Sequence, residues 1–242
     1  MAKELQKLLS TVRQAAEHYE MIDDGDLVAV GLSGGKDSGA LLLALAKMRT
    51  FYPKKYEVCA VTVDMGFPGG DAAFAPVADW CRQLGVELRV VKTEISEIVF
   101  GERKEKNPCS LCAKMRRGAL TDEAVRIGAG KLALGHQLED AAETLMMSLI
   151  HEGRIGSFMP VTVYEDRGIS VIRPLIYTRE ADIKALVRKE NVPVAESLCP
   201  ENGETERAGM KDVLRSQDRE HRGVYRRIIT ALEKSGLDGW KE

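Results

Sequence analysis

The stretch AVGLSGGKDSGALLLAL, residues 29–45, decides the fold of this 242-residue chain. An apolar run ends at Gly31, a loop of small and polar residues follows from Ser33 to Ser38, and apolar residues then return at helical spacing. A loop between a strand and a helix offers backbone N–H groups at the helix N-terminus, and such groups bind phosphate. Lys36 adds a cation to this loop, but Asp37 adds an anion that a plain phosphate-binding loop would avoid.

The rest of the chain repeats the strand-and-helix pattern. We expect strands over the following ranges: 27–31, 56–64, 86–91 and 131–134, with a strand pair at 161–163 and 169–172. We expect helices over these ranges: 38–49, 72–84, 111–127, 138–150 and 179–190, followed by one final charged helix. Continuous apolar strands separated by helices are typical of a parallel sheet covered on both faces. The predicted fold is therefore α/β, a doubly wound parallel sheet with a short helical C-terminal extension.

Composition indicates an ordinary soluble protein, with 44% hydrophobic and 30% charged residues. The sequence contains no apolar run of the roughly 18 residues needed to span a bilayer. Its N-terminus has the spacing of an amphipathic helix rather than of a signal peptide, so we predict a cytoplasmic protein that does not engage a membrane. The net charge of −2 favours no particular partner, and any argument for nucleic-acid binding has to rest on local clusters.

The loop after the first strand does not match two common nucleotide-binding patterns. A Walker A loop needs Gly at the position of Val30 and Ser or Thr at the position of Asp37. The glycines also have the wrong spacing for the dinucleotide-binding pattern G-x-G-x-x-G. One interpretation is a glycine-rich turn that merely closes a strand-helix unit.

The full string SGGKDS, from Ser33 to Ser38, resembles the PP-loop of the ATP pyrophosphatase family, whose members cleave ATP between the α and β phosphates. The resemblance implies that this loop binds the pyrophosphate part of ATP through Ser33, Gly34, Gly35, Lys36, Asp37 and Ser38. It also implies that Asp37 helps to place Mg²⁺, for which a carboxylate oxygen is a suitable hard ligand. The presence of Asp37 in a phosphate-binding loop is then explained, because a reaction at the α-phosphate of ATP requires Mg²⁺ beside the leaving pyrophosphate.

Two further strand ends carry residues that the same resemblance assigns to the nucleotide. Val63 and Asp64 end the second strand and are candidate adenosine contacts, although Val63 is interpreted equally well as a core residue. GHQLED, residues 135–140, resembles the Gly-His-x-x-Asp-Asp signature of tRNA-modifying members, with Glu139 in place of the first acid. The resemblance makes three of these residues candidates: Gly135 and His136 for nucleotide binding, and Asp140 for catalysis.

Five cysteines in a chain without a secretion signal argue against a disulfide framework. Cys109 and Cys112 have the C-x-x-C spacing of a zinc half-site, a redox dithiol or an iron–sulfur half-site. Cys59 lies in an apolar strand and Cys81 on a helix, so both are predicted to be buried small hydrophobic residues. Cys199, in a loop, is then the candidate third ligand.

PCSLCAKMRRGAL, residues 108–120, resembles the tRNA 2-thiocytidine synthetases, which combine a PP-loop with a three-cysteine [4Fe–4S] cluster. The resemblance implies that Cys109, Cys112 and Cys199 bind the cluster and leave one iron to hold sulfur. The chain lacks the zinc-binding ends of the related 2-thiouridine synthetases. However, Pro-Glu-Asn follows Cys199 where bacterial thiocytidine enzymes have Gly-Ser, so the base and the tRNA position stay open.

The resemblance divides the chain into an N-terminal helix (1–25), a PP-loop domain with the iron–sulfur site (26–200) and a helical extension (201–242). It implies an ATP-dependent tRNA sulfurtransferase in which a base carbonyl, favoured as cytidine C2, attacks the α-phosphate and sulfur then expels AMP. The candidate catalytic residues are Lys36, Asp37, Arg116, Asp140 and Cys199. The implied cofactors are ATP, Mg²⁺ and a [4Fe–4S] cluster, and the implied partners are tRNA and a sulfur donor, either a cysteine desulfurase or sulfide. Because relatives are often dimers, a homodimer is a further expectation of the resemblance.

Three alternatives remain at this point. A cluster-free PP-loop ligase related to lysidine, NAD or GMP synthetases would need no cysteines. A sulfurtransferase acting on a small molecule would keep the cluster without binding RNA. A nucleotide-binding module without enzymatic activity would bind ATP and release no pyrophosphate.

Two groups of basic residues are candidates for RNA contact. Lys114, Arg116 and Arg117 directly follow the cysteine pair, and we expect them to meet RNA or substrate near the cluster. The second group repeats along the terminal helix: Arg207, Lys211, Arg215, Arg219, Arg222, Arg226 and Arg227. For this group a solvated helix face, with interleaved acidic residues as partners, is the preferred interpretation.

Overall fold

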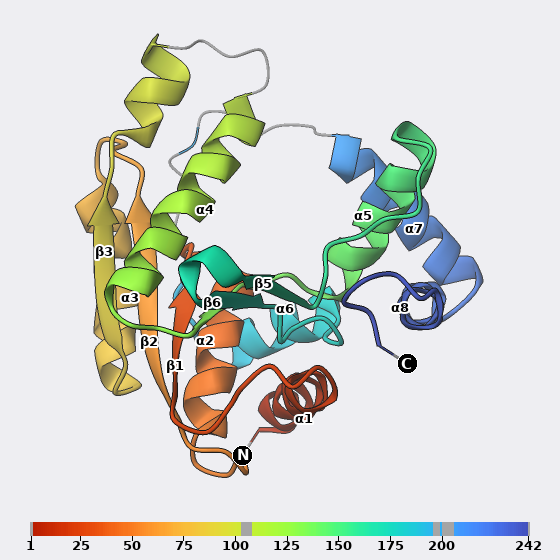
Figure 1. The fold of residues 1–242 in the computed structure, drawn as a ribbon, viewed down its shortest axis with the longest axis horizontal. Helices are drawn as coiled ribbons and strands as arrows, with labels where there is room; N and C mark the ends of the chain where they lie inside the picture. Colours follow the sequence, from red (N-terminus) through yellow and green to blue (C-terminus); the bar gives the residue numbers. More distant parts are fainter. Residues whose placement is uncertain (1, 103–107, 196–198, 200–205, 242) are drawn as a thin grey trace.

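A six-stranded sheet forms the centre of the computed structural model, which describes residues 2–102, 108–195, 199 and 206–241 (Figure 1). The strands are β1 (Asp26–Gly31), β2 (Tyr56–Asp64), β3 (Glu87–Lys92), β4 (Lys131–Ala133), β5 (Val161–Tyr164) and β6 (Ile169–Ile172). The α-helices are α1 (Lys3–His18), α2 (Lys36–Met48), α3 (Gly70–Gln83), α4 (Pro108–Arg126), α5 (Leu138–His151), α6 (Glu180–Lys189), α7 (Glu206–Glu220) and α8 (Val224–Lys234).

The strands follow the order β3-β2-β1-β4-β6-β5, and all neighbours are parallel except the antiparallel pair β5 and β6. This confirms the predicted α/β fold and the predicted strand pair at its edge. The chain leaves β1 toward β2 on one side and later returns to β4 on the other. Such a reversal opens a crevice at the carboxyl ends of the two central strands. The loops after β1 and β4 both lie at this crevice.

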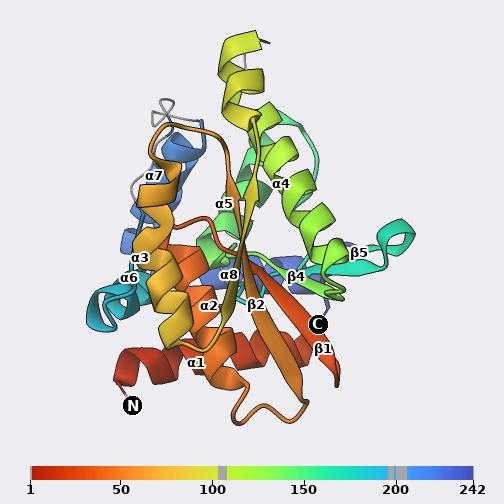
Figure 2. The same ribbon diagram turned by 90° about the vertical axis from the view of Figure 1, so that its left-hand side faces the viewer.

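Helices cover both faces of the sheet, because its central strands are apolar on both sides. Figure 2 shows α2 and α3 against one face and α4 against the other. The last four residues of β1 are buried, and ten of the thirteen residues of α2 are buried as well. The amphipathic helix α1 packs against α2 and α6 through six buried residues: Leu5, Leu8, Leu9, Val12, Ala15 and Ala16.

The C-terminal region differs from the prediction of one final helix. Two helices, α7 and α8, meet at Gly223, whose φ of 90° lies in the left-handed region that favours glycine. Arg227 stabilises the break by donating to the backbone carbonyls of His221 and Arg222. A π-helical turn over Glu97–Glu102 was also not predicted. Among the described residues, no helix is long and apolar enough to cross a membrane.

Candidate active site

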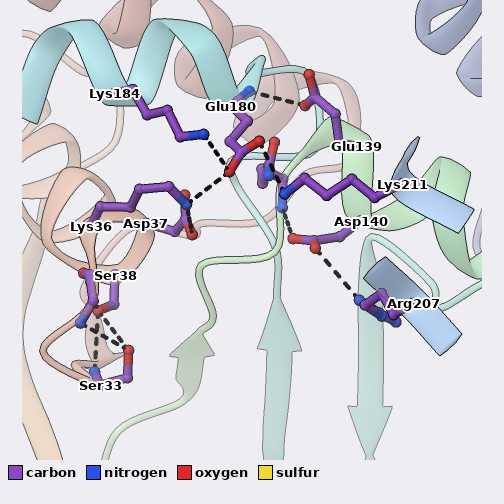
Figure 3. A network of polar contacts seen from close by, with 12 residues as sticks. Ser33, Lys36, Asp37, Ser38, Glu139, Asp140, Glu180, Lys184, Arg207 and Lys211 are labelled. Carbon is purple, nitrogen blue, oxygen red and sulfur yellow. Dashed lines mark hydrogen bonds and ion pairs between the residues drawn. The ribbon is translucent and has the colours of Figure 1, made fainter. Parts of the chain in front are cut away.

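Two serines fix the loop between β1 and α2. The Ser33 N–H donates to Ser38 Oγ over 3.1 Å, and the two hydroxyl oxygens lie 3.0 Å apart (Figure 3). Gly34 has a φ of 80°, which turns the chain sharply before the helix. The following helix begins at Lys36, and its N-cap residue Gly35 supplies no side-chain hydrogen bond, so the first backbone N–H groups of the helix have no partner from a capping side chain. The loop therefore has the conformation of an anion site at a helix N-terminus.

Lys36 and Asp37 form a close ion pair beside this loop. Lys36 Nζ lies 2.7 Å from Asp37 Oδ2 and 3.3 Å from Glu180 Oε1. Burial by itself would lower the pKa of Lys36, but these two carboxylates outweigh burial and raise it above its ordinary value. The other oxygen, Asp37 Oδ1, is buried without a hydrogen-bond partner. An orphaned carboxylate oxygen at an anion site fits the ligand set of a hard cation such as Mg²⁺.

A cavity of about 270 Å³ lies at the ends of β1, β2 and β4, beside α4. It brings together most of the residues that the sequence assigned to the nucleotide: Ser33, Asp37, Ser38, Val63, Gly135 and His136. Arg116 of α4, a candidate catalytic residue, lines the same cavity. Gly135 is required here by close packing, because a Cβ at this position would meet the Ser38 backbone nitrogen at 3.0 Å.

His136 is a neutral wall of this cavity rather than a proton donor. Burial lowers the pKa of its imidazole to about 3, and the nearby positive charges of Arg173, Arg207 and Arg117 add to the effect. Its ring packs against Phe158 with centroids 4.9 Å apart, and the Arg173 guanidinium lies over Phe158 at 5.1 Å. His136 Nδ1 is buried without a partner, so it offers one hydrogen-bonding atom to a bound ligand.

A second cavity, of about 370 Å³, gathers the three predicted cysteine ligands. Cys109 is exposed, Cys112 is buried and Cys199 is partly buried, and all three line this cavity. Burial raises the pKa of the Cys112 thiol, whereas the charge of Arg116 opposes this rise. Cys112 Sγ also lies 3.6 Å from Met65 Sδ. Within the part of the chain that is described, no three His, Cys, Asp or Glu residues are arranged closely enough to hold a metal ion.

The remaining two cysteines behave as the sequence predicts. Cys59 on β2 and Cys81 on α3 are both buried, and burial raises the pKa of each thiol to about 11. Such thiols stay protonated at neutral pH and act as small apolar side chains.

The two cavities share walls around the phosphate loop. Ser33, Val63 and Arg116 line both, and Asp64 lines the cysteine cavity. The segment that leads to Cys199 also packs on the loop: the Ala195 N–H donates to the Gly34 carbonyl over 2.9 Å. The thiols and the phosphate loop are therefore neighbours, although their residues lie up to about 165 positions apart in the sequence.

Asp140 and Glu139 do not line either cavity. Asp140 Oδ2 accepts the Gln137 N–H over 2.9 Å and so caps the N-terminus of α5, while Oδ1 lies 3.5 Å from Arg207. Burial raises the pKa of Asp140 in spite of these contacts. Glu139, which stands where the family signature has its first acid, accepts hydrogen bonds from the Arg179 side chain and the Glu180 N–H. Both acids thus hold neighbouring helices in place.

The preferred interpretation of a solvated basic face with interleaved acidic partners holds only in part for the first half of α7: Arg215 is exposed and pairs with Asp212 at 3.9 Å, but contacts to other helices are added. Arg207 pairs with Asp140 on α5, and Lys211 and Arg215 both lie 3.0 Å from the buried Glu180. Four basic residues of the group further along the chain are also exposed: Arg219, Arg222, Arg226 and Arg227. A sequence pattern cannot reveal this difference, because the acidic partners belong to other elements.

Comparisons with known proteins agree with this geometry. A family model described as a PP-loop domain matches residues 4–214. The tRNA-cytidine(32) 2-sulfurtransferase of Shewanella amazonensis is 37% identical over 231 residues, which cover 95% of this chain and 72% of that protein. Its namesake from Geobacter sulfurreducens is 35% identical, covering 93% of this chain and 88% of that protein. The U34-tRNA thiolase NcsA from Methanococcus maripaludis, solved with its [4Fe-4S] cluster, superposes with a TM-score of 0.81 at 24% identity, covering 98% of this chain and 80% of that one.

Proposed function

Because the chain belongs to the PP-loop family and, within it, to the tRNA-cytidine(32) 2-sulfurtransferases, we propose that it is an ATP-dependent enzyme that replaces a tRNA base oxygen with sulfur. The observation that carries this proposal is the shared wall between the two cavities. Ser33, Val63 and Arg116 face both the phosphate-loop cavity and the cavity with the three thiols. A single tRNA nucleotide bound at this wall can therefore be activated by ATP from one cavity and receive sulfur from the other.

In the first step, the loop residues bind the triphosphate of ATP. The N–H groups at the start of α2 face the phosphate oxygens, and the orphaned Asp37 Oδ1 is the natural ligand for the accompanying Mg²⁺. A base carbonyl oxygen attacks the α-phosphorus, forming one P–O bond as the bond to the β-phosphate breaks. Lys36 and the loop N–H groups stabilise the charge that develops on the departing pyrophosphate.

The adenylated base is then open to a sulfur nucleophile, which forms a C–S bond as the C–O bond to AMP breaks. Neutral His136 and Val63 wall the nucleotide cavity, and His136 Nδ1 supplies a hydrogen-bonding atom within it. Arg116 faces both cavities and is placed to stabilise the phosphate of the departing AMP. The preferred base position is cytidine C2.

The three thiols around the second cavity fit an iron–sulfur cluster, because soft thiolate ligands on a partly closed apolar wall are the usual surroundings of such a group. Cys109, Cys112 and Cys199 would hold it. When bound, a [4Fe–4S] cluster with three cysteine ligands supplies an iron position at which sulfur can be held for transfer.

Substrate RNA reaches this site across α4. Arg116 and Arg117 lie on the helix that carries Cys109 and Cys112, and the exposed Lys114 is on the same turn. Cationic side chains of this kind neutralise RNA phosphates. The proposal also includes a sulfur donor, which is either a cysteine desulfurase or sulfide. It further includes a homodimeric assembly and a cytoplasmic location. The division of the chain into residues 1–25, 26–200 and 201–242 belongs to it as well.

Anaerobic purification with an iron count and a visible spectrum, followed by incubation with MgATP, sulfide and bulk tRNA, tests the proposal. We expect iron in the wild type and 2-thiocytidine among the nucleosides detected by mass spectrometry. Cys199→Ala should lose most of the iron and all thiolation, yet still bind ATP. Cys81→Ala is the matched control, because this thiol is buried in the core and lines neither cavity, and it should retain iron and activity.

Three results would contradict parts of the proposal. Unchanged iron in Cys199→Ala would exclude the three-cysteine site. Full activity of colourless, iron-free protein would favour a cluster-free ligase. Sulfur transfer without any retardation of tRNA in a gel-shift assay would indicate a small-molecule substrate.

A further inference from the structure

A buried carboxylate outside the two cavities contacts the lysine of the phosphate loop. Glu180 is the first residue of α6, and its side chain is only 9% exposed. Four cations surround it: Lys36 at 3.3 Å, Lys184 at 3.1 Å and Lys211 at 3.0 Å, which Figure 3 shows, and Arg215 at 3.0 Å. Burial by itself would raise the pKa of Glu180, but these partners lower it to about 2. The carboxylate is therefore charged at neutral pH.

The backbone around Glu180 is anchored on two sides. Its N–H donates to Glu139 Oε2 over 2.9 Å, which satisfies a free N–H group at the start of α6. The neighbouring Arg179 donates to Glu139 on α5 over 2.7 Å and to Asp218 on α7 over 2.9 Å. These contacts fix the start of α6 relative to α5 and α7, so the Glu180 carboxylate is held at a set place beside the phosphate loop.

We propose that Glu180 is a positioning residue for base activation, which shares Lys36 with Asp37 and releases it to the phosphates when ATP binds. This inference rests on the proposed function of the same site. Lys36 is shared between Asp37 and Glu180 in this structure. Once Lys36 turns to the pyrophosphate, three cations remain on Glu180, so no buried charge is left without a partner.

The loss of Glu180 has a definite consequence for Lys36. The ammonium group would pair with Asp37 alone, in a contact that keeps the lysine from the phosphates and the carboxylate from Mg²⁺. Lys184, Lys211 and Arg215 would also repel Lys36 without a carboxylate between them. Because the surplus positive charge still attracts ATP, the defect should fall on the chemical step rather than on binding.

Steady-state kinetics of pyrophosphate release separate positioning from a merely structural role. We expect Glu180→Gln to lower kcat by roughly 10-fold or more while the KM for MgATP changes by less than about 3-fold. Glu180→Asp should recover part of kcat, because the shorter carboxylate keeps its charge. Asp182→Asn is the matched control on the same helix: Asp182 pairs with the surface residue Lys7 at 2.8 Å, and its loss should change neither constant.

A double-mutant cycle tests whether Glu180 acts through Lys36. In a Lys36→Met background, Glu180→Gln should reduce the residual rate by less than about 2-fold, since the group that it positions is already gone. Lys211→Met removes one of the two contacts between α7 and Glu180 and leaves Lys36 in place, and we expect it to leave kcat within about 3-fold of the wild type. If the two effects in the cycle multiply, or if Lys211→Met reproduces the Glu180→Gln defect, Glu180 only joins α6 to α7 and the proposal is wrong.

A chemical measurement on the ligand-free protein needs neither ATP nor tRNA. The acylation rate of Lys36 by an amine-reactive ester can be followed by mass spectrometry, with the exposed Lys47 on α2 as internal reference. We expect several-fold faster acylation of Lys36 in Glu180→Gln and no change in Asp182→Asn. An unchanged rate would overturn the positioning role even if the wild type thiolates tRNA. If Lys36 is acylated faster in Glu180→Gln but the wild type does not thiolate tRNA, the positioning role is supported and only the proposed function is rejected.

Discussion

The phosphate loop and the cysteine cavity share a wall, but different interactions define them. The loop is fixed by hydrogen bonds between Ser33 and Ser38 and by ion pairs of Lys36. In the cysteine cavity, Cys109 and Cys112 come from α4 and Cys199 from the segment beyond α6. These thiols face one space, yet in the described part of the chain they do not form a group close enough to hold a metal.

The comparison shows that the nucleotide site is largely complete in the folded chain, whereas the thiols are only brought to the same cavity. Hydrogen bonds and ion pairs within the protein supply the energy that shapes the loop. Thiolates repel one another, so their closer approach requires a bound cation that offsets this repulsion. ATP should thus bind to the protein without its metal group, whereas sulfur transfer should require both regions.

The largest expected effect separates the two regions. Asp37→Asn removes the charge of the orphaned carboxylate while keeping its shape, and we expect the rate of pyrophosphate release to fall on the order of 10²–10³-fold. Iron content should stay at the wild-type level, because Asp37 does not line the cysteine cavity. Parallel measurements of iron and pyrophosphate check this prediction. Loss of iron in this variant would contradict the independence of the two regions.

A second prediction concerns the pH dependence of stability that the buried carboxyl group of Glu143 on α5 causes. Burial, together with the negative charge of Asp140, raises the pKa of Glu143 to about 7. A raised carboxyl pKa gives stability that is present below about pH 4.5 and is lost as the pH rises through 7. Glu143→Gln should therefore gain up to about 3 kcal/mol in unfolding free energy relative to the wild type between pH 5 and pH 8.

Urea unfolding of the wild type and Glu143→Gln at pH 5 and pH 8 measures this difference directly. Asp182→Asn provides the control, because it removes a carboxylate from an ion pair with the exposed Lys7 rather than from the core. An equal difference between Glu143→Gln and the wild type at both values of pH would contradict the prediction.

The smallest effect tests the contact that links the two regions. Gly34 and Gly25 have similar φ values, 80° and 84°, so alanine is equally strained at both. At Gly34 a Cβ would also lie 2.8 Å from Ala195 Cβ, whereas a Cβ at Gly25 would meet nothing within 4 Å. We expect Gly25→Ala to cost about 1 kcal/mol of stability and Gly34→Ala about 2 kcal/mol.

Denaturant titration of both variants gives these costs, and iron counts add the functional readout. Gly34→Ala should also retain less iron than Gly25→Ala, because its Cβ displaces Ala195, which precedes Cys199 in the chain. Equal stability and equal iron in the two variants would show that the contact with Ala195 does not join the regions.

Much of the fold follows from local sequence patterns. The range of β2 matches the prediction at both ends, and most other elements differ by one to three residues, because apolar periodicity and the turn residues act locally. The prediction of one final helix failed at Gly223. A single glycine inside a charged helical pattern does not reveal by itself that it adopts a positive φ.

Local sequence patterns are sufficient to predict the individual strands and helices, the phosphate loop and the cysteine spacing, since each of these depends on residues close together in the chain. Only the tertiary structure decided which charges meet: Glu180 appears in the sequence as an ordinary acid in the first turn of a helix, and Lys211 and Arg215 as a solvated stripe. Their contacts join α6 to α2 and α7 across gaps of 31 to 144 positions. Electrostatic pairing depends on distance and burial in space, and neither is encoded in the local pattern that forms each helix.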